Sequence, residues 1–340
     1  MKWIGCSEDT VKLISLLIAL LTVFFISFMV GRYPIAPDTA LGILAAKIMH
    51  ITPFWTPNTE IILFKIRLPR IIAAMLVGAA LSAAGAAYQG MFRNPMVSPD
   101  ILGVTAGASF GAAIAILLSW SALGIQLSAY VFGLIAVLLT YGIATWVGKR
   151  GDRVLMMILA GIIIGMLFAS FVSLTKFVAD PENTLPAITY WLLGSLASAS
   201  GEAVYITAIP ILLGLMLLLA LRWNLNVISF GDEEAKALGV NVIRLRFFVI
   251  LAATLITSAA VSISGTISMV GLVVPHLSRM IVGPNNKILL PVSVVMGAIF
   301  LLLVDDFART LFSIEVPLGI LTSIIGAPFF IYLLYKTHKG

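Results

Sequence analysis

Ten apolar stretches follow one another along the chain, separated by Gly, Pro and clusters of charged residues. They cover residues 13–31, 66–88, 101–119, 126–147, 154–178, 203–221, 247–264, 267–282, 288–304 and 317–335. A helix needs about 20 apolar residues to cross the roughly 30 Å hydrocarbon core of a bilayer, and it satisfies its own backbone hydrogen bonds there. The pattern predicts an all-α membrane protein with about ten transmembrane helices, in a single domain over residues 1–340.

Composition agrees with that prediction. Hydrophobic residues make up 61% of the chain and charged residues only 11%, whereas soluble domains run nearer 45–50% and about 25%. The net charge of +6 would suggest a nucleic-acid partner in a soluble protein, but basic loops also orient membrane proteins. We therefore expect membrane lipid and no nucleic acid as a partner. The single cysteine, Cys6, allows neither an intrachain disulfide nor a cysteine metal cluster.

The basic residues predict the orientation of the chain. If the N-terminus is cytoplasmic, the inner segments carry Lys2, Lys12, Arg93, Lys149, Arg150, Arg153, Arg222, Lys236, Arg244, Arg246, Arg279, Lys287, Lys336 and Lys339. The outer segments carry only Arg32, Lys47, Lys65, Arg67, Arg70, Lys176 and Arg309. This excess satisfies the positive-inside rule and predicts that both termini are cytoplasmic.

Three connecting segments are too long to be simple turns. The outer segments 32–65 and 179–202 hold several Pro, Trp and Tyr residues and are predicted to carry short helices at the membrane surface. The inner segment 222–246 contains three consecutive acids, Asp232 to Glu234, then Ala, Lys and Leu, and then Gly239. This order predicts a two-turn helix with an acidic first turn and a glycine stop. It is either a solvated connector or a docking element for a partner.

Small residues recur at helix-packing spacing. They are Gly78, Ser82 and Gly85, then Gly103, Gly107 and Gly111, then Gly161 and Gly165. Because lipid supplies no hydrophobic drive between helices, such positions let backbones approach closely.

Two segments resemble catalytic motifs, but neither fits its motif. Gly142 to Arg150 resembles a phosphate loop, but it has one intervening residue too many and Arg150 where Ser or Thr should bind Mg²⁺. Gly107 to Gly111 matches the nucleophile-elbow pattern but lies in an apolar helix, and His276, its imagined base, follows Pro275. We expect no enzyme activity, no metal site and no cofactor, so that any ATP hydrolysis belongs to another chain.

Ordered motifs along nearly the whole chain resemble the FecCD-type permeases of ABC importers for iron-siderophores, heme and cobalamin. They are Arg67-Leu68-Pro69-Arg70, Leu76 to Leu81, Gln89 to Gly103, Leu159-Ala160-Gly161, Tyr190 to Ser195, Gly231 to Val240, Gly271 to Arg279, Asp305 to Arg309, Pro317-Leu318-Gly319 and Gly326-Ala327-Pro328. The resemblance implies the type II ABC importer permease fold, in the cytoplasmic (inner) membrane.

The resemblance also implies partners. They are a second copy of the chain in a homodimer, two cytoplasmic ATPase subunits that bind ATP and Mg²⁺, and an extracytoplasmic substrate-binding protein. The ATPase would contact a coupling helix made of Gly231, Asp232, Glu233, Glu234, Ala235, Lys236, Leu238 and Gly239. The binding protein would present glutamates to Arg67, Arg70 and Arg309, consistent with bidentate Arg–carboxylate pairing.

By the same resemblance, Asn94 and Met96 lie near the inner gate. Val154 and Leu155 match the start of the fifth helix, which also contributes to the gate, although they are apolar where the cobalamin members are polar.

The predicted mechanism is alternating access driven by the partner ATPases. The rival hypothesis is an ion-coupled secondary transporter, which requires buried Asp, Glu or Arg within the spans, and the sequence indicates none. The substrate stays open between iron-siderophore, heme, cobalamin and molybdate.

Overall fold

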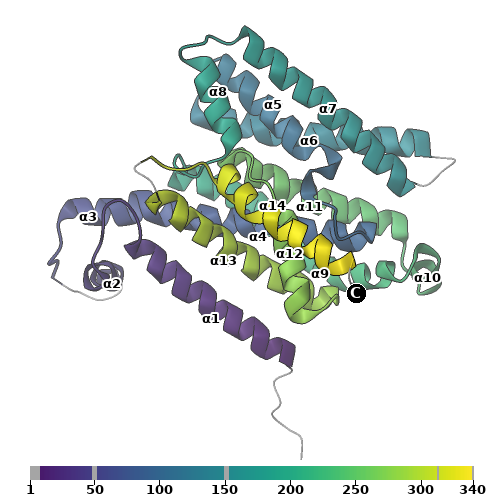
Figure 1. Ribbon diagram of the computed structural model, residues 1–340, viewed down its shortest axis with the longest axis horizontal. Helices are drawn as coiled ribbons and strands as arrows, with labels where there is room; N and C mark the ends of the chain where they lie inside the picture. Colours follow the sequence, from purple (N-terminus) through teal and green to yellow (C-terminus); the bar gives the residue numbers. More distant parts are fainter. Residues whose placement is uncertain (1–7, 48–51, 149–152, 312–313, 339–340) are drawn as a thin grey trace, which may run out of the picture.

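The structure is a computed structural model that describes residues 8–47, 52–148, 153–311 and 314–338. Its described residues form helices and connecting loops and contain no strand. The helices lie roughly side by side, with α2, α3 and α8 gathered at one end and α10 at the other (Figure 1). These are called the α8 end and the α10 end below.

Each of the ten predicted apolar stretches coincides with one helix, which confirms the all-α membrane fold. The helices are α1 (Glu8–Met29), α4 (Leu68–Phe92), α5 (Val104–Leu117), α6 (Ala122–Val147), α7 (Arg153–Val178), α9 (Gly201–Ser229), α11 (Val242–Ser264), α12 (Val270–Val282), α13 (Asn286–Thr310) and α14 (Leu318–His338). Seven of the described helical segments are long and apolar enough to cross a membrane on their own.

Helices α5 and α12 are shorter than predicted. They have 14 and 13 residues, or about 20 Å at 1.5 Å per residue, which is less than the thickness of the hydrocarbon core. Each follows a non-α-helical lead-in: the 3₁₀ turn η2 (Pro99–Leu102) and Gly103 before α5, and residues 265–269 before α12. Gly103 and Gly265 both have positive φ, so the chain changes direction there.

Short helices lie in the three long connections, as predicted. Segment 32–65 forms α2 (Pro37–Ala46) and α3 (Pro57–Ile61), followed by the π-helical turn η1 (Ile62–Arg67) that leads into α4. Segment 179–202 forms α8 (Thr184–Leu193), and segment 222–246 contains α10 (Asp232–Ala237).

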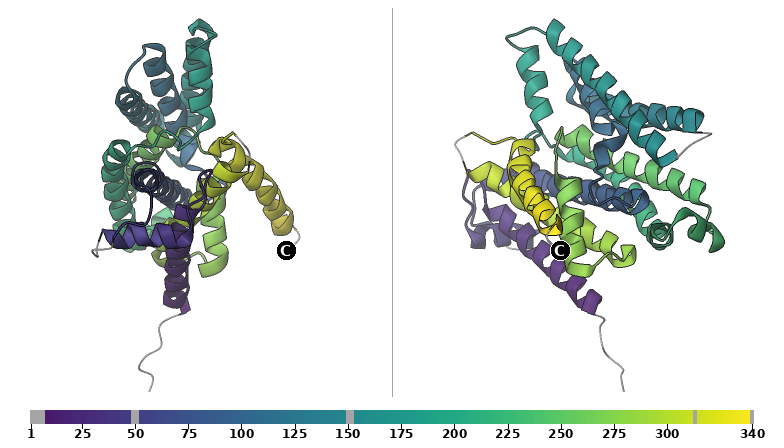
Figure 2. Two further views of the ribbon diagram at one scale, coloured as in Figure 1. Left: turned by 90° about the vertical axis from the view of Figure 1, so that its left-hand side faces the viewer. Right: turned by 45° about the vertical axis from the view of Figure 1, so that its right-hand side comes forward.

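Helix α4 is the centre of the bundle, with α13, α11, α9 and α12 packed around it (Figure 2). Two of its glycines meet backbone: a Cβ on Gly78 would overlap the carbonyl of Gly297 in α13, and one on Gly85 would overlap the carbonyl of Gly271 in α12. Gly107 likewise faces the backbone of α6 at Phe132. The predicted small-residue spacing is therefore a helix-packing device.

The orientation in the membrane stays a prediction. Four of the basic residues on which it depends, Lys2, Lys149, Arg150 and Lys339, lie outside the described residues. The described inner residues Arg93 and Arg246 are at the α10 end, and Arg70 and Arg309 are at the α8 end, which matches the predicted separation.

Candidate functional sites

Helix α10 is a compact element with defined ends. Its N-cap is Gly231, whose φ of 142° favours glycine, because a side chain there would be strained and would collide with Glu234. At the other end Gly239 has a φ of 80°. The Gly239 amide donates to the Lys236 carbonyl at 2.9 Å and the Val240 amide to the Ala235 carbonyl at 2.9 Å, which is a Schellman motif.

One face of α10 is anchored and the other is exposed. Ala235 is fully buried, and Nη2 of Arg246 in α11 donates to the Asp232 carboxylate at 2.9 Å. Opposite this anchor, the side chain of Glu233 is 83% exposed and pairs only with Lys236 at 2.8 Å. Glu234, Leu238 and Phe230 are exposed beside it. The exposed face combines two carboxylates with two apolar side chains, a pattern suited to a protein partner.

The predicted gate residues Asn94 and Met96 lie in a structured loop after α4. Arg93 ends α4 in the left-handed region with a φ of 52°, and the Asn94 side-chain oxygen accepts from the Met96 amide at 2.9 Å. Both Asn94 and Met96 are exposed. Gln89 holds this loop in place. No role for Gln89 was predicted from the sequence.

Gln89 connects this loop to α12. Its side chain is buried, its amide nitrogen donates to the Val97 carbonyl at 3.4 Å, and its oxygen accepts from Nη2 of Arg279 at 3.1 Å. A glutamine in the otherwise Ala- and Gly-rich sequence of α4 is the signal that could have identified Gln89 as a functional residue.

Val154 and Leu155, the other gate candidates, lie in the first turn of α7, and Leu155 is 48% exposed. About two turns further into α7, Gly161 lies against the backbone of Ile101 in η2, and the contact leaves no room for a side chain. The segment after Asn94 and Met96 thus packs on the helix that Val154 and Leu155 begin. A gate role for all four residues stays a prediction.

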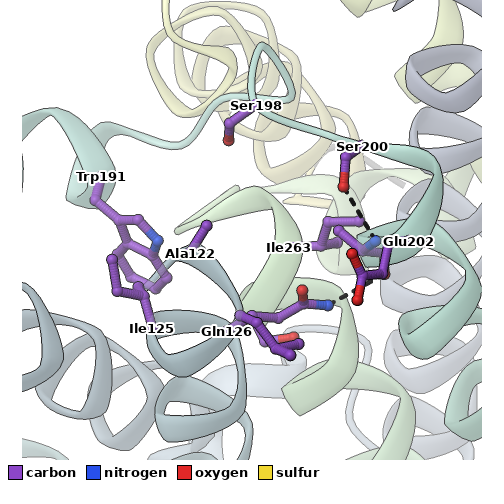
Figure 3. Close-up of a pocket in the computed structure, with 11 residues that line it drawn as sticks. Ala122, Ile125, Gln126, Trp191, Ser198, Ser200, Glu202 and Ile263 are labelled. Carbon is purple, nitrogen blue, oxygen red and sulfur yellow. Dashed lines mark hydrogen bonds between the residues drawn. The ribbon is translucent and has the colours of Figure 1, made fainter. Parts of the chain in front are cut away.

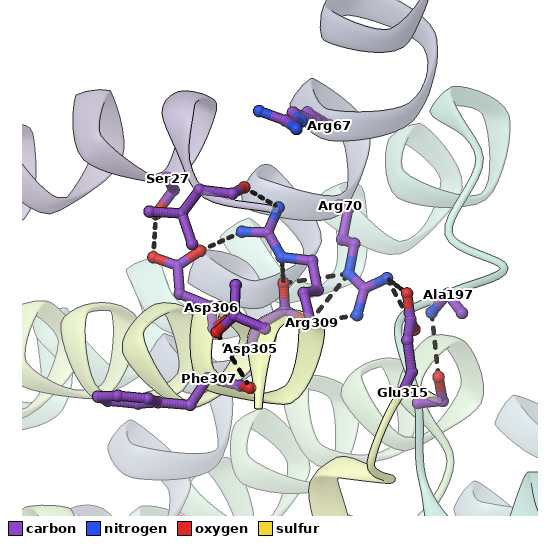
Figure 4. A network of polar contacts seen from close by, with 12 residues as sticks. Ser27, Arg67, Arg70, Ala197, Asp305, Asp306, Phe307, Arg309 and Glu315 are labelled. Carbon is purple, nitrogen blue, oxygen red and sulfur yellow. Dashed lines mark hydrogen bonds and ion pairs between the residues drawn. The ribbon is translucent and has the colours of Figure 1, made fainter. Parts of the chain in front are cut away.

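A buried cluster of charged side chains lies at the α8 end (Figure 4). Nε and Nη2 of Arg70 donate to Asp305, with distances of 2.8 to 3.1 Å. Nη1 of Arg70 donates to both carboxylate oxygens of Glu315 at 2.9 and 3.0 Å. Arg309 pairs with Asp305 at 3.1 Å and also with Asp306. The side chain of Asp305 is fully buried and that of Glu315 is 23% exposed.

Two further contacts tie this cluster to α1. The hydroxyl of Ser27 donates to Asp306 at 2.6 Å, and Arg309 donates to the carbonyl of Val30 at 3.1 Å. Among the residues that the structure describes, Arg67 has no carboxylate partner. Its guanidinium donates to the carbonyl of Phe28, near the end of α1, and to the carbonyl of Tyr33, which follows α1.

The three outer arginines are buried in this structure. Arg67, Arg70 and Arg309 are only 5%, 6% and 5% exposed, and partners in the same chain hold them. Their docking role stays a prediction, and it requires a partner to compete with those internal contacts. Apart from Glu315, the charges of the cluster lie in the first turn of α4 and the last turns of α13, at the ends of these helices and not at their middle.

A cavity of about 300 Å³ lies beside α8 (Figure 3). Trp191 forms one side of it, Gln126 and Glu202 form the other, and the hydroxyls of Ser198 and Ser200 border it. Gln126 is fixed because its amide nitrogen donates to Thr207 at 2.6 Å. The cavity is lined without a cationic side chain. Within the described ranges no group of three or more His, Cys, Asp or Glu is placed to hold a metal ion.

The model of the FecCD transport family matches residues 18–336. The molybdate import system permease MolB of Haemophilus influenzae is 41% identical over 328 residues, covering 96% of both chains. A Helicobacter pylori protein named for iron chelatin transport is 40% identical and covers 83% of this chain and 84% of its own.

A solved structure described as an inward-facing ABC transporter of metal-chelate type has a TM-score of 0.85 to this chain. It is 40% identical, and the match covers 96% of this chain and 99% of that one.

Proposed function

Because the chain belongs to the FecCD transport family, we propose that it is the membrane permease subunit of an ABC importer that carries a metal chelate across the cytoplasmic membrane. The subunit hydrolyses no ATP; separate ATPase subunits do so, with their own ATP and Mg²⁺. The observation that carries the proposal is α10, a short helix anchored at Asp232 and exposed at Glu233 and Glu234.

The anchor makes α10 a mechanical link. Asp232 pairs with Arg246 at 2.9 Å, and Arg246 belongs to α11, whose far end borders the cavity beside α8 through Ser262 and Ile263. A displacement of α10 is therefore transmitted to α11, which runs the length of the bundle. Two such subunits in a homodimer, each on one ATPase, would open their common pathway to one side at a time.

The α8 end is the proposed docking side for an extracytoplasmic binding protein. Arg70 already holds one buried carboxylate, Asp305, and one partly exposed carboxylate, Glu315. A carboxylate of the binding protein would replace Glu315 on Arg70, since Glu315 is the partner that solvent reaches. Both termini are then cytoplasmic, together with α10.

For the substrate we propose an iron chelate. Relatives of similar identity are named for molybdate and for iron chelatin, so the class of small metal-containing anions or chelates is common to both. A cavity lined without cations suits a chelate whose charge is already masked better than a free oxyanion, which favours a chelate over molybdate.

Uptake into proteoliposomes tests the proposal. The permease, reconstituted with its ATPase and binding protein, should accumulate an iron–siderophore only with ATP inside, and the permease alone should not. Replacing Glu233 and Glu234 by Lys should abolish ATP-driven uptake, whereas Glu8→Lys, at an exposed carboxylate in the first turn of α1, should not. Uptake by the permease alone under an ion gradient would establish the rival secondary transporter.

A further inference from the structure

A narrow groove runs between α6 and α11 toward the α10 end. Its apolar part measures about 150 Å³ and is bordered on α6 by Leu134, Leu138 and Tyr141 and on α11 by Phe247, Leu251 and Leu255. Almost no polar atom borders this part. The rings of Tyr141 and Phe247 pack edge to face, with their centroids 5.8 Å apart. Leu138 is 68% exposed and Leu251 37% exposed, so the groove opens sideways, toward lipid.

The groove ends at a cation. A smaller hollow shares Tyr141 with the apolar part and is completed by Thr145 and Arg246. The side chain of Arg246 is 13% exposed. Its Nη2 donates to Asp232, but its Nε is buried and has no partner among the described residues. An unsatisfied buried donor on a charged group is costly, and an anionic oxygen would relieve that cost.

The charge around Arg246 also favours an anion. Arg93 lies 3.9 Å from the Asp232 carboxylate that Arg246 holds at 2.9 Å. Two guanidinium groups therefore share one carboxylate, and Arg244 is exposed in the same turn of α11 as Arg246. This end of the groove keeps a surplus positive charge.

The length of the groove fits one acyl chain in one leaflet. Arg246 and Leu255 are nine residues apart on α11, which corresponds to about 13 Å at 1.5 Å per residue. Half of the hydrocarbon core is about 15 Å. An apolar slot of this length with a cation at its interfacial end matches a phospholipid, with the phosphate on Arg246 and an acyl chain between α6 and α11.

We propose that the α6–α11 groove is a binding site for an anionic phospholipid whose phosphate is held by Arg246. Because Arg246 also anchors α10 through Asp232, the bound headgroup lies directly behind the exposed docking face of α10. The proposal rests on the proposed function only for naming the leaflet, which is the cytoplasmic one if α10 meets the ATPase.

Photolabelling of the full-length permease tests this site without ATPase, nucleotide or binding protein, so its outcome is independent of the transport proposal. The protein is reconstituted in vesicles of equal parts phosphatidylglycerol and phosphatidylethanolamine, with a trace of either lipid carrying a diazirine in its acyl chain. Mass spectrometry then locates the labelled residues. We expect the phosphatidylglycerol probe to label the groove at Leu138 and Leu251 several-fold more than the phosphatidylethanolamine probe.

Three variants sharpen the test. Arg246→Gln should lower groove labelling about tenfold, the factor that corresponds to about 1.4 kcal/mol, and Arg246→Lys, which keeps the charge but loses Nε, should lower it less. Leu251→Trp should block the groove, while Ile163→Trp, on an exposed face of α7, should leave labelling unchanged. Thermal unfolding of each variant establishes that it folds; if Arg246→Gln does not, Arg246→Lys and Leu251→Trp decide the question.

Equal groove labelling by the two probes, or undiminished labelling in Arg246→Gln and in Leu251→Trp, would overturn the proposal.

Discussion

Arg70 donates to both carboxylate oxygens of Glu315, at 2.9 and 3.0 Å. Arg70 is on the first turn of α4, and Glu315 lies three residues before α14 begins. The pair therefore connects the central helix to the last helix at the α8 end. On the other side of the same guanidinium, Asp305 is fully buried, so Arg70 joins α4 to the end of α13 and to the loop before α14, both more than 230 positions later in the sequence.

Removal of Arg70 should destabilise the fold strongly. Arg70→Ala leaves the Asp305 carboxylate buried with Arg309 as its remaining partner, and breaking one side of a buried ion pair costs about 3–5 kcal/mol. Thermal unfolding in detergent measures the effect. The matched control is Lys65→Ala, an exposed lysine just before α4, which should change stability by less than about 0.5 kcal/mol. Equal unfolding midpoints for Arg70→Ala and wild type would contradict a structural role for the cluster.

Loss of the Glu315 charge should have a smaller effect on stability and a larger one on docking. Glu315→Gln removes a partly exposed partner of Arg70, so we expect a cost of about 1 kcal/mol. If a carboxylate of the binding protein competes for Arg70, the variant should bind that protein more tightly than wild type does. Titration of the binding protein onto reconstituted permease measures the affinity. A weaker or unchanged affinity would show that Arg70 is not the docking group.

The glycine contacts of α4 should tolerate no side chain. Gly85→Ala places a methyl group on the carbonyl of Gly271, and the backbones of α4 and α12 must separate to accept it. We expect a loss of about 1–3 kcal/mol, visible as lower yield and earlier thermal unfolding. Gly142→Ala is the control within another helix, because nothing lies within 4 Å of its Cβ. It should be neutral or stabilising by up to about 1 kcal/mol.

Separating Gln89 from the loop should loosen the predicted gate. Gln89→Leu keeps the volume but removes the donor to the Val97 carbonyl and the acceptor for Arg279. Substrate or a small dye should then leak through reconstituted permease in the absence of ATP. Thr22→Val, at an exposed hydroxyl that donates to a carbonyl of its own helix, α1, is the comparison. A leak no greater than in the Thr22→Val protein would place Gln89 outside the gate.

The elements that the sequence predicted best are those whose signal is local. The apolar stretches located ten helices, and the Asp232 to Glu234 run with Gly239 located α10, since a helix of two turns depends on its own end signals. The lengths of α5 and α12 were overestimated. Residues 101–103 and 267–269 include Ile101, Leu102, Ile267 and Met269, and hydropathy does not distinguish an apolar 3₁₀ turn or extended lead-in from helix.

Ion pairs between residues far apart in the sequence could not be predicted from the local sequence pattern. Arg70 and Asp305 are 235 positions apart, and charges near the ends of apolar stretches are usually placed at the interface. The arginines were accordingly expected to face outward. The local spacing of Asp305, Asp306 and Arg309, at three and four residues, was the available sign that these charges neutralise one another inside the protein.

The contacts of α4 with α12 and α13 bear on how the subunit changes shape. Where Gly78 meets Gly297 and Gly85 meets Gly271, backbone touches backbone with no side chain between, so neither neighbour can slide along α4 without a steric clash. These three helices therefore form a rigid core of the subunit. Displacement transmitted from α10 must then be absorbed by bending within α11 or by rotation of α5, α6 and α7 together. A hinge for such a rotation is expected at Gly103, in the lead-in to α5.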